Sequence, residues 1–248
     1  MLMKDRIVVI TGAGSGIGKA AAILFAEHGA HVAALDVNAD AVRQTVTDLP
    51  PGRHLAISCD VTSEEQCNQA ARVVETELGV PDVLINNAGY AEHGDFLDVS
   101  LDQWKSIMNV NVYGTVNVSK AFLPAMKAAR RGSIINVSSV AGQRGARGFG
   151  GPHYTASKAA IIGITKSMAR EFAEDGIRVN TVAPGFTETN IFKGRLDDTI
   201  RSSMIAALPL GRGGQAQDTA GAMLYLASDL STFVTGSTID VNGGGNMR

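Results

Sequence analysis

Residues 6–18 read RIVVITGAGSGIG. The run RIVVIT is rich in β-branched residues and predicts a buried strand, and the glycines after it predict a tight turn into a helix. Unpaired backbone N–H groups and the dipole at a helix N-terminus attract a phosphate, and glycines let the backbone approach it closely. The stretch therefore predicts a strand, turn and helix that can hold a nucleotide.

The spacing of the glycines narrows the kind of nucleotide site. Gly12, Gly16 and Gly18 form the pattern GxxxGxG, whereas the strict dinucleotide pattern GxGxxG is absent. The phosphate-loop pattern GxxxxGK[ST] is also absent, because Lys19 is followed by Ala20. Kinase and NTPase chemistry is therefore disfavoured. By itself the turn leaves open a second reading, a tight turn that holds no ligand.

Apolar runs rich in Val and Ile recur along the chain and alternate with longer segments of helical spacing, such as residues 19–29, 63–79 and 102–129. Such alternation predicts a doubly wound parallel sheet of the Rossmann type, an α/β fold with helices on both faces. The predicted strands are RIVVIT (6–11), HVAALD (31–36), HLAISCD (54–60), DVLINN (82–87), SIINVSS (133–139), IRVNTVA (177–183) and STIDV (237–241).

Composition limits the class of protein. The 248 residues are 45% hydrophobic and 19% charged with a net charge of -2, which fits one globular domain over residues 1–248. Without runs of like charge or long apolar segments, we expect neither a nucleic-acid nor a membrane partner. The start of the chain lacks the pattern of a signal peptide, and Cys59 and Cys67 form no CxxC pair. We expect a cytoplasmic protein without a metal site.

Asp36 ends the second predicted strand, some twenty residues after the glycines. A carboxylate at this position can accept hydrogen bonds from the adenine ribose hydroxyls and would repel a 2′-phosphate. Val37 and Asn38 follow it and supply no arginine that could offset the repulsion. The sequence therefore favours NAD over NADP. In the alternative reading, Asp36 only caps the next helix.

Several short motifs follow one another in order along the chain: TGAGSGIG (11–18), NNAG (86–89), SS (138–139), YTASK (154–158) and PGFTET (184–189). With them the chain resembles the short-chain dehydrogenase/reductase family, and the resemblance extends through LPLGR (208–212) and VTGSTIDVNGG (234–244). It departs from the family pattern at Asn242, where the family usually has Asp before the glycine pair. We expect that departure to affect C-terminal packing more than chemistry.

The resemblance implies a role for each matching residue. It implies a catalytic tetrad of Asn111, Ser139, Tyr154 and Lys158. It also implies a homotetramer in which the helices around residues 102–129 and 154–174 form one interface. The residues that would bind the cofactor are Gly12, Ser15, Gly16, Ile17, Gly18, Asp36, Asp60, Val61, Asn87, Tyr154, Lys158, Pro184, Gly185, Thr187 and Thr189.

The chemistry of the tetrad agrees with its spacing. Tyr154 and Lys158 are four apart in HYTASKAA (153–160), so they share one helix face among small neighbours. A tyrosine hydroxyl has a pKa of about 10, and we expect the Lys158 ammonium to lower it so that Tyr154 can act as general acid or base. Ser139 would hold the substrate oxygen, and Asn111 would bind a water that relays protons.

Each of these residues also has a purely structural reading. Tyr154 could pack in a core with Lys158 extending to solvent. Ser139 could cap a turn, and Asn111 could lie on a helix surface. These readings stay open until the residues are placed in space.

The sequence thus predicts an oxidoreductase that transfers a hydride between NAD(H) and a small secondary alcohol or ketone. One alternative is a 3-oxoacyl-[acyl-carrier-protein] reductase that uses NADPH, which PGFTET and LPLGR also suggest, and another is a cofactor-binding regulator without turnover. A serine hydrolase is disfavoured because no GxSxG occurs.

Two irregular segments follow predicted strands, where ligands bind in open α/β sheets. We expect residues 187–214 to form a substrate lid. In the segment 142–152, Arg144 and Arg147 read as solvated loop charges, although contact with an anionic substrate stays open. For both segments, a surface loop without function is the alternative.

Overall fold

A computed structural model describes residues 1–146, 150–189 and 197–247 of the chain. Every run predicted as a strand forms one, and all pair in parallel in a 7-stranded sheet of order β3-β2-β1-β4-β5-β6-β7. The strands are β1 (Ile7–Thr11), β2 (His31–Asp36), β3 (Leu55–Ser58), β4 (Val83–Asn86), β5 (Gly132–Val137), β6 (Ile177–Pro184) and β7 (Thr238–Val241). The predicted doubly wound α/β fold is confirmed.

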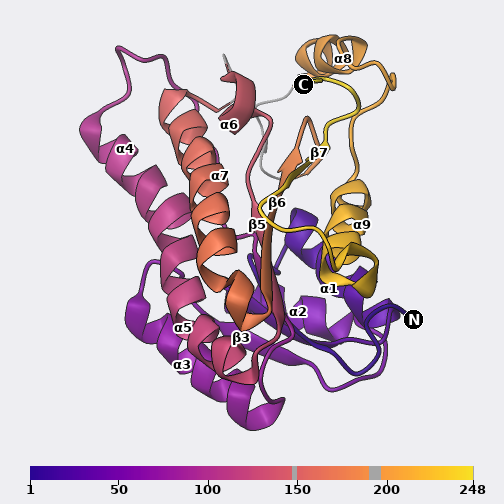
Figure 1. Cartoon of the computed structure of the whole chain (residues 1–248). Helices are drawn as coiled ribbons and strands as arrows, with labels where there is room; N and C mark the ends of the chain where they lie inside the picture. Colours follow the sequence, from indigo (N-terminus) through magenta and orange to yellow (C-terminus); the bar gives the residue numbers. More distant parts are fainter. Residues whose placement is uncertain (147–149, 190–196, 248) are drawn as a thin grey trace.

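Helices cover both faces of this sheet (Figure 1). One face carries α1 (Gly16–Glu27), α2 (Ala39–Thr47) and α9 (Ala216–Ala227), and the other carries α3 (Glu64–Glu77), α5 (Gly114–Ala129) and α7 (Pro152–Phe172). Shorter elements are α4 (Leu101–Met108), α6 (Ala141–Arg144), α8 (Asp198–Ala206), the 3-10 turns η2 (Ala173–Asp175) and η4 (Asp229–Ser231), and the π-helical η1 (Asn109–Tyr113). None of the described helices is both long and apolar enough to cross a membrane.

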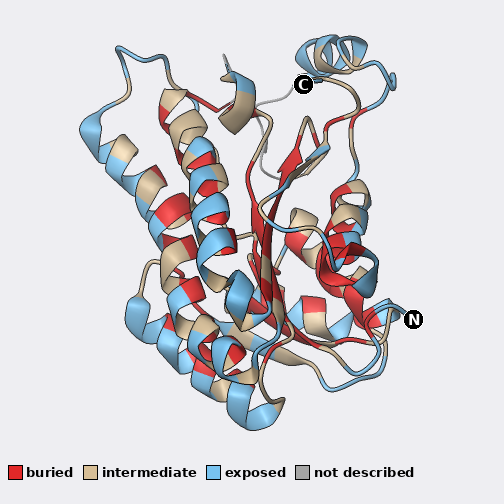
Figure 2. Ribbon diagram, in the orientation of Figure 1, coloured by how far each residue is buried: buried red, intermediate tan, exposed pale blue. Residues whose placement is uncertain are grey.

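Burial explains why the central strands read as continuous apolar runs. Every residue of β1 and β4 is buried, because helices cover both faces of a parallel sheet, whereas the edge strand β3 alternates between half-buried and exposed positions. Alternate residues of β1 enter different clusters: Ile10 packs with Phe25 of α1, and Val9 packs with Phe122 of α5. Figure 2 shows the two cores as buried residues on either side of the sheet.

Side-chain caps fix where several helices begin. The Asn38 side chain accepts hydrogen bonds from the backbone N–H groups of Asp40 and Ala41 at the start of α2. Ser63 caps α3, and Ser100 forms a capping box with Gln103 at the start of α4. Each cap gives a hydrogen-bond acceptor to backbone N–H groups that the first turn of the helix leaves without a partner.

The segment predicted as one helix over residues 102–129 is interrupted. Between α4 and α5 the chain makes a π-helical turn, η1, with the sequence NVNVY. Asparagine and valine are poor helix formers, and Asn111 uses its side chain to bond the backbone of Tyr90. Single π turns inside α-helices occur frequently at functional sites.

A buried chain of polar side chains joins three strands to the helices α5 and α7. Asn86 Nδ2 donates to Ser119 Oγ at 3.0 Å and to Asn136 Oδ1 at 2.8 Å. Asn136 Nδ2 donates to Thr165 Oγ1 at 2.9 Å, which also accepts from Thr181 Oγ1. All five side chains are buried, so each hydrogen bond is shielded from water and fixes a helix on the sheet.

Asn136→Ala should therefore destabilise the fold by about 2–4 kcal/mol, because Asn86 loses a buried acceptor and Thr165 loses a buried donor. Urea unfolding followed by far-UV circular dichroism measures the change. Asn68→Ala, at an exposed position of α3, is the matched control. Equal stability of the two variants would contradict a structural role for the polar chain.

Candidate active site

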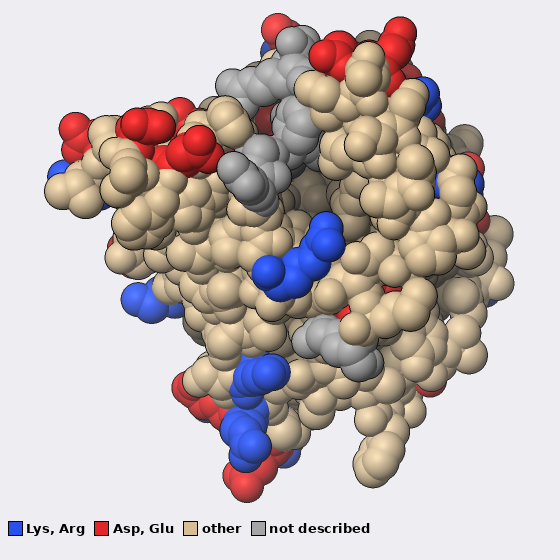
Figure 3. Space-filling view, turned by 90° about the horizontal axis from the view of Figure 1, so that it is seen from above, with Lys and Arg blue, Asp and Glu red and all other residues tan. Residues whose placement is uncertain are grey.

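Most of the predicted site residues line one cleft at the carboxyl edge of the sheet, whereas Gly18 and Asn111 are not among its lining residues. The strand order reverses between β1 and β4, and ligands of open α/β sheets bind in the crevice at such a point. A cleft of about 1710 Å³ opens there, lined by residues that follow β1, β2, β4, β5 and β6. Figure 3, seen from above the view of Figure 1, shows this face hollowed near its centre. The volume exceeds that of an ordinary small-ligand pocket and suits a dinucleotide together with a second ligand.

The glycine turn after β1 forms one wall of the cleft. Gly12 has a φ of +65°, and a Cβ there would lie 2.9 Å from the Ala88 Cα and from Asn87 Nδ2. Only glycine therefore allows the turn to pack on the segment after β4. Ser15 is the N-cap of α1 but makes no side-chain capping bond. Ser15, Gly16 and Ile17 line the cleft, so the N-terminus of α1 can serve a bound anion.

Asp36 lies at the adjoining end of the cleft. Its carboxylate accepts from the Gly14 N–H at 2.8 Å and from the Asn38 N–H at 2.9 Å. Because Asn38 is the N-cap of α2, the alternative in which Asp36 caps that helix is wrong. Each carboxylate oxygen of Asp36 accepts one of these hydrogen bonds. Since a carboxylate oxygen can accept a second hydrogen bond, both oxygens can still accept one from a ligand.

Asp60 and Val61 lie beside Asp36 in the loop after β3. The Asp60 carboxylate accepts from the backbone and the hydroxyl of Thr62, and the Val61 carbonyl accepts from Asn117 Nδ2 of α5. Both residues line the cleft as predicted, and the loop that carries them is held from two sides. Asn117 was not identified from the sequence, because its spacing resembles that of an ordinary helix-surface residue.

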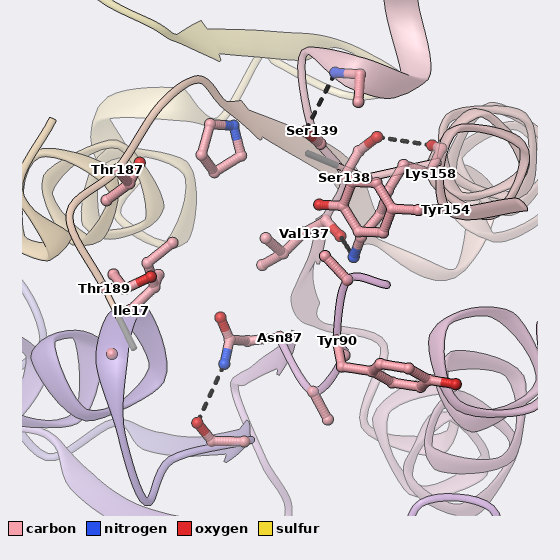
Figure 4. Close-up of a pocket in the computed structure, with 18 of the residues that line it drawn as sticks. Ile17, Asn87, Tyr90, Val137, Ser138, Ser139, Tyr154, Lys158, Thr187 and Thr189 are labelled. Carbon is pink, nitrogen blue, oxygen red and sulfur yellow. Dashed lines mark hydrogen bonds between the residues drawn. The ribbon is translucent and has the colours of Figure 1, made fainter. Parts of the chain in front are cut away.

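Asn87 connects the two central strands at the reversal point. Its Nδ2 donates to the carbonyls of Thr11 at 2.9 Å and Gly12 at 3.2 Å, while Thr11 Oγ1 accepts from the N–H groups of Asn87 and Ala88 at 3.0 Å. The motif NNAG thus supports the glycine turn. In Figure 4, Asn87 stands between this turn and the wall that carries the tetrad.

Three residues of the predicted tetrad form the opposite wall. Ser139 follows β5, while Tyr154 and Lys158 lie in the first turns of α7. Figure 4 shows the Tyr154 hydroxyl directed into the cleft. Lys158 is 5% exposed, and its Nζ lies 5.8 Å from the centroid of the Tyr154 ring. The reading in which Lys158 extends to solvent is therefore wrong.

Burial controls the protonation of this pair. Burial raises the pKa of Tyr154, and a hydrogen bond with Ser139 opposes that rise. Burial also lowers the pKa of Lys158 to about 8. We expected the ammonium to lower the pKa of Tyr154, but Lys158 Nζ instead donates to the Val137 carbonyl at 2.9 Å. In this arrangement burial, and not the Lys158 ammonium, has the largest effect on the pKa of the Tyr154 phenol.

Asn111 is 1% exposed, so its placement on a helix surface is excluded. Its Oδ1 accepts from the Tyr90 N–H, and its Nδ2 donates to the Tyr90 carbonyl and to Ser157 Oγ, each at 3.0 Å. The π turn presents this side chain between the segment after β4 and α7. A Cβ on Gly89 would lie 2.9 Å from Asn111 Oδ1, so a glycine is needed there. The side chain positions both segments, and the proton relay stays a prediction.

The segment after β6 closes the cleft. Pro184, Gly185, Thr187 and Thr189 line it as predicted. The Pro184 carbonyl accepts from the Val140 N–H at 3.0 Å, and Thr187 pairs with Gly214 in an isolated β-bridge. Figure 4 shows Thr187 and Thr189 on the side of Ile17, across the cleft from Tyr154.

Asn242, the departure from the family pattern, also borders the cleft. Its side chain accepts from the Gly244 N–H and donates to the Asn246 carbonyl, each at 2.9 Å. Both of these bonds shape the C-terminal turn. The expected effect on packing therefore agrees with the contacts of this residue.

The expected lid is described only in part. Residues 190–196 lie outside the described residues, as does Arg147. From the described part, Met204, Ala207 and Leu208 line the cleft, as does Phe186 just before the segment. These residues were missed from the sequence, since the long, mixed segment shows no periodicity that would assign its side chains to a ligand.

Comparison with known proteins agrees with this geometry. Residues 12–246 match the family model described as enoyl-(acyl carrier protein) reductase. The chain is 48% identical to an uncharacterized short-chain type dehydrogenase/reductase of Sinorhizobium fredii, with 98% of each chain covered. It is 40% identical to a 3-oxoacyl-[acyl-carrier-protein] reductase of Thermotoga maritima, over 98% of this chain and 99% of that one. It is 37% identical to a meso-2,3-butanediol dehydrogenase of Serratia marcescens, over 98% and 96%.

A solved structure has the same fold. It is a 3-oxoacyl-[acyl-carrier protein] reductase from Brucella melitensis with bound NAD, which matches with a TM-score of 0.91 and 38% identity over 100% of this chain and 93% of that one. Similarity of this extent covers the glycine turn, the Tyr154–Lys158 wall and the segment after β6. The chain belongs to the short-chain dehydrogenase/reductase family and is an NAD(P)-dependent oxidoreductase.

Proposed function

We propose that the protein transfers a hydride between NAD(H) and a secondary alcohol or its ketone. One observation carries the proposal: the Tyr154 hydroxyl projects into the cleft beside Ser139, with Lys158 buried next to it. An acid or base at that position lies across the cleft from the glycine turn that carries Ile17. A dinucleotide and a small carbonyl compound would meet there.

The cofactor fits the residues that are present. The glycine turn and the N-terminus of α1 would hold the diphosphate, and Asp36 would accept the ribose hydroxyls with the lone pairs that its contacts to Gly14 and Asn38 leave free. Thr187 and Thr189 would hold the nicotinamide end. Bound NAD(H) supplies the hydride chemistry, and the protein orients the reacting atoms.

The protein's own residues handle the proton. In oxidation, Tyr154 takes the proton from the substrate hydroxyl, and in reduction it returns one to the carbonyl oxygen. Ser139 holds that oxygen next to the phenol. Lys158 keeps a positive charge below a pH of about 8 and favours the phenolate when it forms. Asn111 keeps the Tyr90 segment and α7 in register, and the described part of the 187–214 segment would cover the substrate.

A 3-oxoacyl-[acyl-carrier-protein] reductase is the second candidate. The names of the relatives from Thermotoga and Brucella favour it. Use of NADPH is disfavoured, because the adenosine end of the cleft carries Asp36 and Asp60, and the cations among the described lining residues are Arg144 and Lys158, which follow β5 or lie on α7. A regulator without turnover is disfavoured because Tyr154, Lys158 and Ser139 converge on one cleft.

We also propose a homotetramer. Large apolar side chains are exposed in two places: Phe96, Leu97, Leu101 and Tyr113 around α4, and Leu230, Phe233 and Met247 near the C-terminus. Leu97 is 94% and Phe233 is 103% exposed. Clusters of such exposed apolar side chains are rare on monomeric proteins and often mark an interface. The first cluster supports the predicted interface of helices 102–129 and 154–174. Two separate self-complementary patches would produce a closed tetramer.

Asp36 should decide the cofactor. We expect NADH to bind at least tenfold more tightly than NADPH, which corresponds to about 1.4 kcal/mol. Asp36→Ala should bring the two dissociation constants closer, because the repulsion of the 2′-phosphate is lost. Titration of cofactor fluorescence measures both constants, and Asp40→Ala in α2 is the control. Equal affinities in the wild type would overturn the NAD assignment.

Tyr154→Phe should lower turnover at least ~10²-fold, because the acid/base group is lost while the ring still packs. Binding of NADH should be nearly unchanged. Reduced-cofactor absorbance with a panel of alcohols and ketones measures turnover, and Tyr225→Phe in α9 is the control. Near-wild-type turnover of Tyr154→Phe would rule out the tetrad and reopen the assignment to a neighbour such as His153.

The dependence of kcat/KM on pH should show the loss of the proton from Lys158. Burial lowers its pKa to about 8, so the ammonium is present below that pH and is lost as the pH rises through it. The pKa of Tyr154 is raised, so the phenol stays protonated in the same range. For ketone reduction, kcat/KM should be level up to a pH of about 7 and fall above 8. A profile that stays level to pH 10, with an unchanged circular dichroism spectrum, would contradict this role.

Assembly is tested by light scattering at micromolar concentration. A tetramer of four 25.9 kDa chains is expected. Phe233→Asp should reduce the particle to a smaller species, because a charge would enter an apolar contact. Lys120→Asp changes an exposed position of α5 in the other proposed interface. Its effect on the size of the particle should be independent of the effect of Phe233→Asp. A monomeric wild type would refute the proposal.

A further inference from the structure

Arg144 is a cation at the substrate end of the cleft. It is the last residue of α6, which starts directly behind Ser139, and it lines the cleft together with Ser139 and Tyr154. The sequence alone favoured a solvated loop charge. The residue is exposed, as that reading expects, but it also lines the cleft that contains Ser139 and Tyr154.

The backbone around Arg144 is held firmly. A Cβ on Gly142 would lie within 2.8 Å of the Lys158 carbonyl oxygen, so α6 packs directly against the backbone of α7. On its other side, Gln143 donates to Asp240 and accepts from Asn246 Nδ2. The base of the Arg144 side chain therefore has a fixed position relative to Lys158, as a binding residue requires.

The charges of the cleft are separated along its length. Its acidic lining residues, among those the structure describes, are Asp36 and Asp60 at the adenosine end, whereas Arg144 lies at the substrate end. Arg144 takes part in none of the ion pairs between described residues. The sequences of the two internal stretches outside the description, 147–149 and 190–196, contain no aspartate or glutamate.

The cleft that Arg144 lines also has large apolar side chains. Phe186, Met204 and Leu208 are among its lining residues. Figure 3 shows basic side chains beside the hollow of this face, while the larger acidic groups lie toward its periphery. An arginine in such surroundings suits an anionic group that arrives on an apolar ligand, and its planar fork suits a carboxylate in two parallel hydrogen bonds.

We propose that Arg144 binds a carboxylate of the substrate, so that the preferred substrates are hydroxy acids and the corresponding oxo acids. This proposal rests on the proposed function. In the oxidation, NAD⁺ would accept the C–H hydride of the alcohol carbon, the phenolate form of Tyr154 would take the hydroxyl proton, and the carboxylate would be unchanged. Arg144 holds the carboxylate while the hydroxyl reaches Ser139 and Tyr154.

The test compares substrates that differ only in charge. Hydroxy acids with the hydroxyl at carbon 2, 3 or 4 are each assayed beside their methyl esters, with NAD⁺ and the purified full chain. For at least one pair, the wild type should have a kcat/KM for the acid at least tenfold above that for the ester. Arg144→Leu should lower this ratio toward one, mainly by raising the KM for the acid.

Two further variants separate a carboxylate contact from general effects. Arg144→Lys keeps the charge but not the fork and should retain an intermediate ratio. Arg72→Leu, at an exposed position of α3, removes one positive charge elsewhere and should keep the wild-type ratio. Loss of the ratio in Arg72→Leu would show a long-range charge effect and overturn the assignment to Arg144.

The remaining outcomes distinguish this proposal from the one it rests on. If uncharged alcohols or esters are turned over as well as the acids, or if Arg144→Leu keeps the ratio, the carboxylate assignment is wrong and the oxidoreductase assignment stands. If a phosphate ester or a thioester alone is turned over, the anion or acyl class is different and the proposal fails. If neither cofactor supports turnover of any alcohol or ketone, both proposals fail.

Discussion

The close approach of the turn after β1 to the segment after β4 is the constraint on which the site depends. Gly12 packs against Asn87 and Ala88 without room for a side chain, and Thr11 accepts two backbone N–H groups from that segment. The strand order reverses between β1 and β4. The contact between the glycine turn and the segment after β4 therefore sets the spacing of the two halves of the sheet where the cleft opens. A larger residue at position 12 would push the glycine turn away from the segment after β4 and so change the spacing of the two walls of the cleft.

The wall that carries Tyr154 and Lys158 shows how burial shifts the pKa values of two ionisable groups in opposite directions. Burial raises the pKa of the phenol of Tyr154 and lowers the pKa of the ammonium of Lys158. Both shifts favour neutral forms, which is the expected effect of removing charged groups from water. The proposed oxidation needs the phenolate form of Tyr154, which a positive charge close to the phenol would stabilise. Burial of Lys158 leaves it near a balance between its two forms, which couples the chemistry to pH in the physiological range.

Much of the fold could be predicted because the sequence repeats a simple pattern. Each buried strand appears as a Val- and Ile-rich run, and the glycine turn, NNAG and YTASK lie at the ends of strands or the start of a helix, where local chemistry requires them. The π turn could not be predicted, because Asn111 leaves the helical pattern to reach Tyr90, a contact between distant segments. Arg144 is exposed, as its loop composition suggests, but its place beside the cleft could not be predicted, because it depends on the packing of α6 against α7.

The π-helical turn also makes the chain sensitive to its length. A π turn holds one residue more than the α-helical turn it replaces, so removal of one residue from Asn109–Tyr113 would restore a regular helix. Both kinds of turn complete about 360°, so α4 and α5 would keep the faces that they bury, including the buried Ile107. The change would fall on Asn111, whose amide would no longer be presented to the Tyr90 carbonyl and to Ser157. In this stretch the number of residues matters as much as their identity, because a deletion would leave the core packed and still release the two segments that Asn111 holds.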